Sequence, residues 1–125
     1  MKVLIVDDES LIRTSLKRVF EGRKHQVVVA ENGQEGLDLW QKSNPDLVIL
    51  DMLMPGLTGA QVLKNMGRPL RSKVILISAY TGEYDIKKAS ELGASLFIPK
   101  PFQSIFEVVE RAEKLFSESA KINAE

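Results

Sequence analysis

The chain has 125 residues and a mass of 14.0 kDa, enough for one domain with a hydrophobic core. Its 44% hydrophobic and 27% charged residues exclude a disordered or fibrous chain, and its 17 basic and 17 acidic residues leave no excess positive charge for nucleic acid or an anionic membrane. The absence of cysteine excludes disulfides, thiol nucleophiles and thiolate metal sites.

Five short aliphatic runs predict β-strands. In chain order they lie at residues 3–6, 27–30, 47–50, 74–77 and 96–98. None of them alternates apolar with polar residues, which is typical of strands that are buried on both faces of a parallel sheet. Pro99 ends the fifth run, and proline favours a strand end or an edge strand.

Each run is followed by a segment in which apolar residues recur with a helical period. These segments lie at residues 11–22, 33–42, 59–66, 83–92 and 105–116. Ser10 and Ser104 are predicted N-caps, whereas Gly67 and Gly93 are predicted helix ends. Residues 117–125 are polar, and we expect them to fray. Residues 118–125 are interpreted as a C-terminal tail or the start of a linker.

The order of these segments is βα repeated five times. This order predicts the α/β class, with a three-layer αβα sandwich and a parallel sheet in the middle. Only four apolar residues follow Lys2 before an acidic stretch, so the N-terminus does not resemble a signal peptide. No apolar run approaches the ~20 residues of a membrane span, and we expect a cytoplasmic protein.

Polar residues follow four of the five predicted strands. They are Asp7, Asp8 and Glu9 after the first, Asp51 after the third, Ser78 after the fourth and Lys100 after the fifth. The carboxyl ends of parallel strands meet at one edge of a sheet, where ligands of open α/β sheets bind. We therefore expect these carboxylates, the hydroxyl and the ammonium group to converge.

Carboxylates that share one cleft repel one another, so that either a pKa rises or a cation binds. A site made only of oxygen ligands suits Mg²⁺ or Mn²⁺. A carboxylate can also act as a covalent nucleophile, and the set is suited to phosphoryl transfer onto a carboxylate. Each residue alone has an ordinary alternative: Asp8 and Glu9 could favour a helix start, Asp51 a turn and Lys100 a solvated strand end. The functional interpretation depends on their combination.

The chain resembles a receiver domain of a bacterial two-component response regulator. The resemblance covers residues 1–117, and its motifs are Val3–Glu9, Pro45–Met52, Met54–Gly56, Ile77–Ala79 and Lys100–Phe102. It implies a (βα)5 flavodoxin-like sheet with strand order 2-1-3-4-5. It also implies that residues 1–117 are the receiver domain.

The resemblance implies a role for each matching position of the acidic site. Asp51 matches the phosphoacceptor. Asp8 matches the direct metal ligand, Asp7 its partner that acts through water, and the backbone carbonyl of Leu53 the remaining protein ligand. The metal implied is Mg²⁺, with Mn²⁺ as a substitute.

Four further positions match the family's switch and catalytic residues. Ser78 matches the switch hydroxyl and Lys100 the lysine that senses the phosphate. Phe97 matches the aromatic residue that turns inward, although the family more often has tyrosine there. The Lys100–Pro101 peptide bond matches one that is usually cis.

The implied function is a phosphorylation-dependent switch of a two-component phosphorelay. Asp51 would accept a phosphoryl group from a sensor histidine kinase or phosphotransfer protein. The face formed by the fourth helix, fifth strand and fifth helix would then change to control an output domain or partner protein. Such a domain is not an enzyme beyond its own Mg²⁺-dependent phosphorylation and dephosphorylation. The sequence leaves open whether the regulator stands alone or is a fragment.

Three alternative functions have less support from the sequence. A flavodoxin-like flavin or nucleotide protein lacks support, since no glycine-rich phosphate loop follows a strand. A haloacid-dehalogenase-type phosphatase would need a second acid two residues after Asp51, where Leu53 stands. A receiver-like scaffold that works without phosphorylation would not need the complete acidic set.

Overall fold

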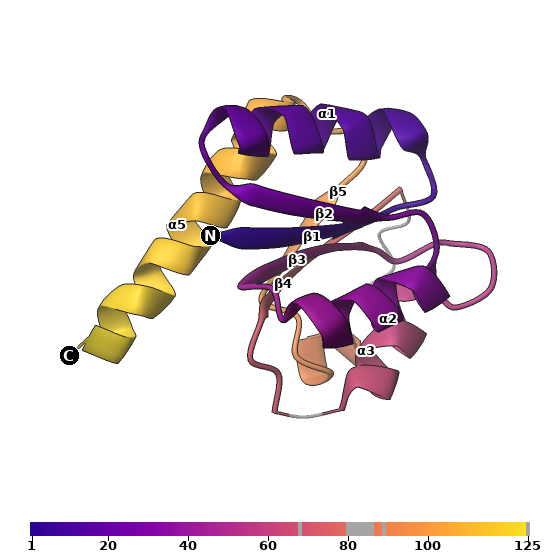
Figure 1. Ribbon diagram of the computed structural model, residues 1–125. Coiled ribbons are helices and arrows are strands. Elements are labelled where there is room, and N and C mark those ends of the chain that lie inside the picture. Colours follow the sequence, from indigo (N-terminus) through magenta and orange to yellow (C-terminus); the bar gives the residue numbers. More distant parts are fainter. Residues whose placement is uncertain (68, 80–86, 89, 125) are drawn as a thin grey trace.

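The computed structural model shows a five-stranded parallel sheet between two layers of helices (Figure 1). The elements are β1 (Lys2–Val6), α1 (Ser10–Gly22), β2 (Gln26–Ala30), α2 (Gly33–Ser43), β3 (Leu47–Asp51), α3 (Gly59–Met66), β4 (Lys73–Ser78), β5 (Leu96–Pro99) and α5 (Ile105–Ala124). The strand order is β2-β1-β3-β4-β5, which confirms the predicted α/β sandwich and its topology, with β5 at an edge. The structure describes residues 1–67, 69–79, 87–88 and 90–124, with side chains up to residue 118.

Both faces of the sheet are buried, which explains the continuous aliphatic runs. In β1, Leu4 and Val6 belong to one core cluster, whereas Val3 and Ile5 belong to the other. The same alternation continues through β3 and β4. All four of these β1 side chains have no exposed surface. Each strand therefore packs apolar side chains in both directions, as a parallel sheet between two helical layers requires.

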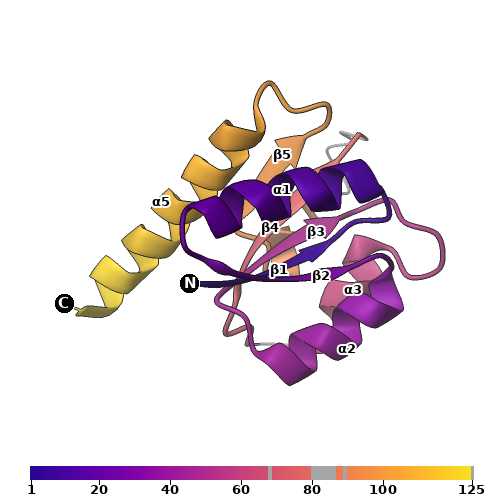
Figure 2. The ribbon, with the colours of Figure 1, turned by 45° about the horizontal axis from the view of Figure 1, so that its top comes forward.

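The helices divide between the two faces of the sheet. The side chains of α1 and α5 pack into one core cluster, and those of α2 and α3 into the other. Figures 1 and 2 show α1 and α5 on one side of the sheet, and α2 and α3 on the other. Helix α2 approaches β1 closely through Gly36, because a Cβ atom there would lie 2.6 Å from Val6 Cγ1. A side chain at that position would force the helix and the strand apart.

The helix ends confirm some of the predicted caps and correct one. Helix α3 ends at the predicted Gly67, and Ser104 Oγ accepts a hydrogen bond from the Phe106 N–H of α5 at 3.1 Å. Ser10, in contrast, lies inside α1, and the N-cap residue is Glu9, whose side chain makes no capping bond. The prediction of Ser10 as the cap was wrong by one residue because the chain turns immediately after Asp8.

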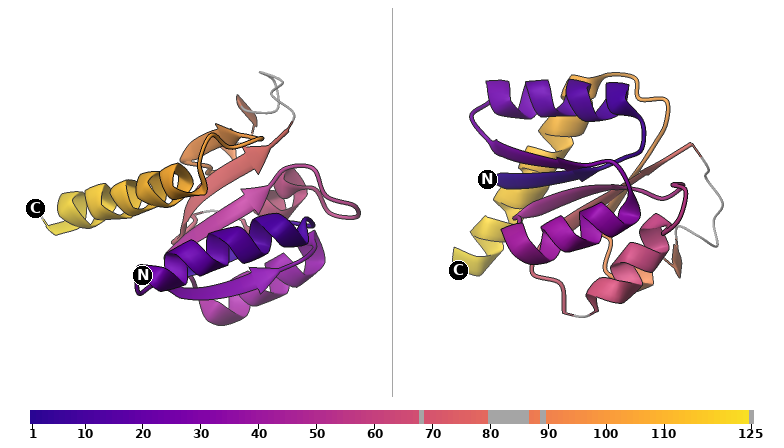
Figure 3. Two further views of the ribbon diagram at one scale, coloured as in Figure 1. Left: turned by 90° about the horizontal axis from the view of Figure 1, so that it is seen from above. Right: turned by 45° about the vertical axis from the view of Figure 1, so that its right-hand side comes forward.

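The C-terminal helix is longer than predicted. It continues to Ala124, beyond the predicted end at residue 116. Neither glycine nor proline follows Phe116 to end the helix, and Ser, Glu, Ala and Lys are all tolerated in helices. Figures 2 and 3 show that the last turns of α5 extend away from the sheet.

One predicted helix and the absence of a membrane span remain to be compared with the structure. Most of the predicted helix at 83–92 lies outside the described residues, although residues 87–88 and 90–91 are helical. Among the described residues, no helix is long and apolar enough to cross a membrane.

Candidate functional site

The strands bring the predicted polar residues to one edge of the sheet. Asp7 directly follows β1, Asp51 is the last residue of β3, and Ser78 is the last residue of β4. The parallel register pairs Asp51 with Ile77 and Ser78 with Pro99, so neighbouring strands end nearly level. This edge lies where the strand arrows point, at the right in Figure 1.

Lys100 connects the acidic residues. Its Nζ atom lies 2.8 Å from Asp7 Oδ2, 2.8 Å from Glu9 Oε1 and 3.3 Å from Asp51 Oδ2. Burial alone would lower the pKa of Lys100, but the contacts with Asp7 and Glu9 and the charge of Asp51 raise it above its ordinary value. Lys100 is therefore a fixed positive charge among the acids.

Asp51 is only 3% exposed. Burial and the charge of Asp7 raise the pKa of its carboxyl to about 6, although Lys100 and a hydrogen bond from the Leu53 N–H act in the opposite direction. That bond reaches Asp51 Oδ1 at 3.2 Å. One carboxylate oxygen thus accepts a backbone bond and the other faces the ammonium group.

The negative charge at this edge exceeds what Lys100 neutralises. Oxygen atoms of Asp7, Asp8, Glu9 and Asp51 lie within 4.8 Å of one another. Asp7 Oδ2 is buried and accepts no well-directed hydrogen bond from the described residues, although Lys100 forms its ion pair. Four carboxylates with a buried oxygen short of donors suit a hard divalent cation, so the donor set fits the implied Mg²⁺.

The remaining predicted site residues lie in or next to the strands that end at this edge of the sheet. Leu53 is 53% exposed at the mouth of the site, and its backbone follows Asp51 by two residues. Ser78 is completely buried, and its backbone carbonyl accepts the Lys100 N–H at 2.8 Å. Phe97 is partly buried and packs against the core cluster that contains Leu76, its partner in β4. The Lys100–Pro101 bond is cis.

Three residues of the site were not assigned a role from the sequence. Glu9 contacts Lys100 directly, and its position next to the acid pair was the available signal. Arg13 donates to the backbone carbonyl of Asp7 at 2.8 Å, which no sequence motif indicated. Gly59 lets α3 pass close to the end of β3, because a Cβ atom there would lie 2.6 Å from the Asp51 carbonyl oxygen.

The parallel sheet has the order β2-β1-β3-β4-β5, and an acidic cluster with Lys100 lies at the carboxyl ends of its strands. This combination is typical of one class of signalling domain. Residues 3–112 match the family described as response regulator receiver domain. The match spans most of the chain, and the chain belongs to this family, whose members are phosphorylation-dependent signalling switches and not classical enzymes.

Relatives of known name include short and long proteins. The chain is 45% identical over 103 residues to sporulation initiation phosphotransferase F of Bacillus subtilis, which covers 81% of the chain and 82% of that protein. It is 37% identical over 118 residues to chemotaxis protein CheY of Listeria monocytogenes, covering 91% and 99%. It is also 38% identical to transcriptional regulatory protein CpxR of Escherichia coli, covering 81% of the chain but only 43% of that relative.

Solved structures agree with the sequence matches. A CheY-like receiver domain protein from Methanospirillum hungatei superimposes with a TM-score of 0.89 at 26% identity, covering 96% of both chains. An N-terminal domain from Wolinella succinogenes gives a TM-score of 0.85 at 34% identity, covering 100% of this chain and 99% of that one.

Proposed function

We propose that Asp51 is the phosphoacceptor of this switch and that a histidine kinase or phosphotransfer protein supplies the phosphoryl group. The observation that carries the proposal is a buried carboxylate, 3.3 Å from Lys100, within a cluster of three other acids. We further propose residues 1–117 as the receiver domain and residues 118–125 as the start of a linker or tail.

The proposed metal ligands are Asp8, Asp51 and the backbone carbonyl of Leu53, with Asp7 acting through water. The excess of carboxylate oxygen in the cluster supports this set. Bound Mg²⁺, or Mn²⁺ in its place, would reduce the repulsion between the Asp51 carboxylate and an anionic phosphoryl group. The chain's own residues supply the remaining chemistry.

In the proposed reaction, a carboxylate oxygen of Asp51 attacks phosphorus as the bond from phosphorus to the donor's histidine nitrogen breaks. The nitrogen leaves with the electron pair of that bond, and Asp51 becomes an acyl phosphate. Lys100 already lies within reach of Asp51 and can neutralise a phosphoryl oxygen, while Ser78 can donate a hydrogen bond to another. We propose that the chain needs no further catalytic group for its own phosphorylation and dephosphorylation.

A test of this chemistry uses a small donor. Acetyl phosphate should add one phosphoryl group to the intact protein when Mg²⁺ is present, and none when the metal is chelated. Asp8→Asn should slow the uptake because a proposed direct ligand is weakened. Asp38→Asn, an exposed change on α2, is the matched control and should behave as the parent protein. Equal uptake with and without the divalent cation would contradict the proposal.

We propose that phosphorylation reaches the output surface through Ser78 and Phe97. Phe97 is only partly buried and packs beside β4, so a shift of the hydroxyl toward the phosphoryl group can change how the ring packs. Amide shift changes on adding beryllofluoride should map to residues 78–110. Changes confined to α1 and α2 would contradict this route.

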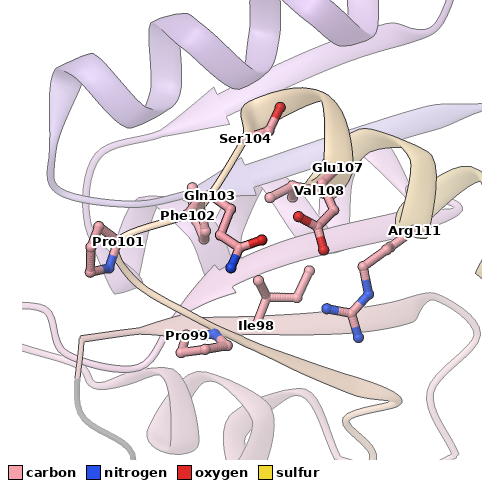
Figure 4. A pocket seen from close by; sticks show the side chains of 9 residues that line it. All are labelled: Ile98, Pro99, Pro101, Phe102, Gln103, Ser104, Glu107, Val108 and Arg111. Carbon is pink, nitrogen blue, oxygen red and sulfur yellow. The ribbon is translucent and has the colours of Figure 1, made fainter.

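The proposed output surface, whose shape would change on phosphorylation, includes a cavity of about 290 Å³ between β5 and α5 (Figure 4). Ile98, Phe102 and Val108 give it apolar walls, and Glu107 and Arg111 line it from successive turns of α5. We propose that an output domain or partner protein, in the cytoplasm, docks on this face. The predicted helix at 83–92 would belong to the same face, but most of it lies outside the described residues. Transcriptional regulators among the longer relatives support an output domain, and a stand-alone partner is supported by the shorter ones.

A further inference from the structure

Arg13 links three segments beside the acidic cluster. Its Nη1 donates to the backbone carbonyl of Asp7 at 2.8 Å, and its Nη2 lies 3.8 Å from Glu31 Oε2. The Arg13 side chain is 17% exposed. The N–H of Asp7 in turn donates to the Ala30 carbonyl at 3.1 Å. One guanidinium thus contacts the end of β1 and the segment after β2 from the first turns of α1.

Among the described residues, the backbone of the acidic loop is held by a small number of hydrogen bonds, including one from the Arg13 N–H to the Glu9 carbonyl at 3.1 Å. This loop consists of residues 7–9, between β1 and α1, and its internal bond runs from the Glu9 N–H to Asp7 Oδ1 at 2.8 Å. Glu9 is the N-cap residue of α1, but its side chain makes no capping bond and instead contacts Lys100. The bond from Arg13 to the Asp7 carbonyl therefore ties the start of this loop to the first turns of α1.

Arg13 and Lys100 differ in what they contact. Lys100 contacts carboxylate oxygens of Asp7, Glu9 and Asp51, which are the atoms that a cation or phosphoryl group would engage. Arg13 contacts a backbone carbonyl, so its bond need not break when a ligand enters. Replacing a residue that hydrogen-bonds to a metal-ligand residue, and so orients it, commonly lowers the metal affinity.

We propose that Arg13 is a positioning residue, which fixes residues 7–9 so that Asp7 and Asp8 are held ready for a divalent cation. The inference rests on the proposed function, since that function places the cation here. The direction of the change in metal affinity on replacing Arg13 distinguishes positioning from a simple charge effect. A nearby positive charge repels a cation, so removing the charge alone would tighten metal binding, whereas losing the positioning bond would weaken it.

The test measures Mn²⁺ binding by the loss of the free-ion electron paramagnetic resonance signal. Arg13→Gln and Arg13→Lys should both weaken binding, the former by about tenfold, because neither side chain has a planar guanidinium that can contact the Asp7 carbonyl and Glu31 at the same time. Lys17→Gln is the matched control: it removes a cation of the same helix that pairs only with Glu21 at 3.2 Å among the described residues. Unchanged or tighter binding by Arg13→Gln would overturn the proposal.

A second measurement does not need the metal. Hydrogen exchange at the Glu9 N–H, measured with a chelator present, should be faster in Arg13→Gln than in the parent and unchanged in Lys17→Gln. Circular dichroism establishes that each variant is folded. If the parent protein fails to bind Mn²⁺, the proposed metal site is wrong, whereas equal exchange at Glu9 in parent and Arg13→Gln would show that Arg13 does not position the loop.

Discussion

Replacing Asp51 with asparagine should stabilise the protein in the absence of metal. The Asp51 carboxyl has its pKa raised from 3.8 to about 6, so the folded state holds its proton more tightly than the unfolded state does. Ionised Asp51 therefore opposes folding above this pKa. The shift corresponds to about 3 kcal/mol at most, and solvent screening at the sheet edge reduces it. We expect Asp51→Asn to raise the free energy of unfolding by about 1–3 kcal/mol at pH ~7.5.

The pH dependence provides the sharper comparison. As the pH falls through 6 toward 3.8, the wild-type carboxyl becomes protonated in the folded state, and the advantage of asparagine should fall to about half at pH ~5. The difference in the free energy of unfolding is measured by urea unfolding with a chelator present. The fluorescence of the buried Trp40 reports the transition. Asp38→Asn, which neutralises an exposed carboxylate, should change stability by less than about 0.5 kcal/mol. A loss of stability in Asp51→Asn at pH ~7.5, or a gain that does not shrink on acidification, would refute the reasoning.

Three further predictions concern the lifetime of the phosphate, the packing of α2 and nucleic acid. Leu53→Asn together with Tyr80→Glu should hasten the loss of acid-labile phosphate after the donor is removed. Leu53 is exposed beside Asp51 and has no polar group that could orient a water molecule. Tyr80 lies outside the described residues. If the double variant loses phosphate no faster than the parent, shielding of the phosphoryl group from water by Leu53 and Tyr80 is excluded. Gly36→Ala should cost about 1–3 kcal/mol in urea unfolding by crowding Val6, whereas Gly22→Ala, with nothing within 4 Å of the added Cβ, should be neutral or slightly stabilising. The isolated chain, with zero net charge, should show no salt-sensitive binding to duplex DNA in a fluorescence anisotropy titration.

The sequence predicted the meeting of Asp7, Asp51 and Lys100 because parallel strands place their carboxyl ends at one edge. No long-range information was needed beyond the βα alternation and the apolar runs. Which carboxylates Lys100 contacts could not be predicted in the same way. A flexible side chain can reach several carboxylates, and its contact with Glu9 depends on how the short loop after β1 turns.

The errors at helix ends have a similar local cause. Ser10 and Glu9 are adjacent, and a shift of one residue in the turn decides which of them is the cap. The extension of α5 to Ala124 could not be located because residues 117–124 contain neither a stop signal nor a strong apolar face. Arg13 was missed because its bond is to a backbone atom, and contacts of that kind leave no sequence motif.

The most direct test of the central claim locates the phosphoryl group. The protein is treated with acetyl phosphate and Mg²⁺ and then with borohydride, which reduces an acyl phosphate to an alcohol, and the peptides are sequenced by mass spectrometry. The account predicts that Asp51 alone is converted to homoserine, and that nothing is converted when the metal is chelated. Conversion at Asp7 or Asp8, or unmodified Asp51 in protein that carries phosphate, would contradict it.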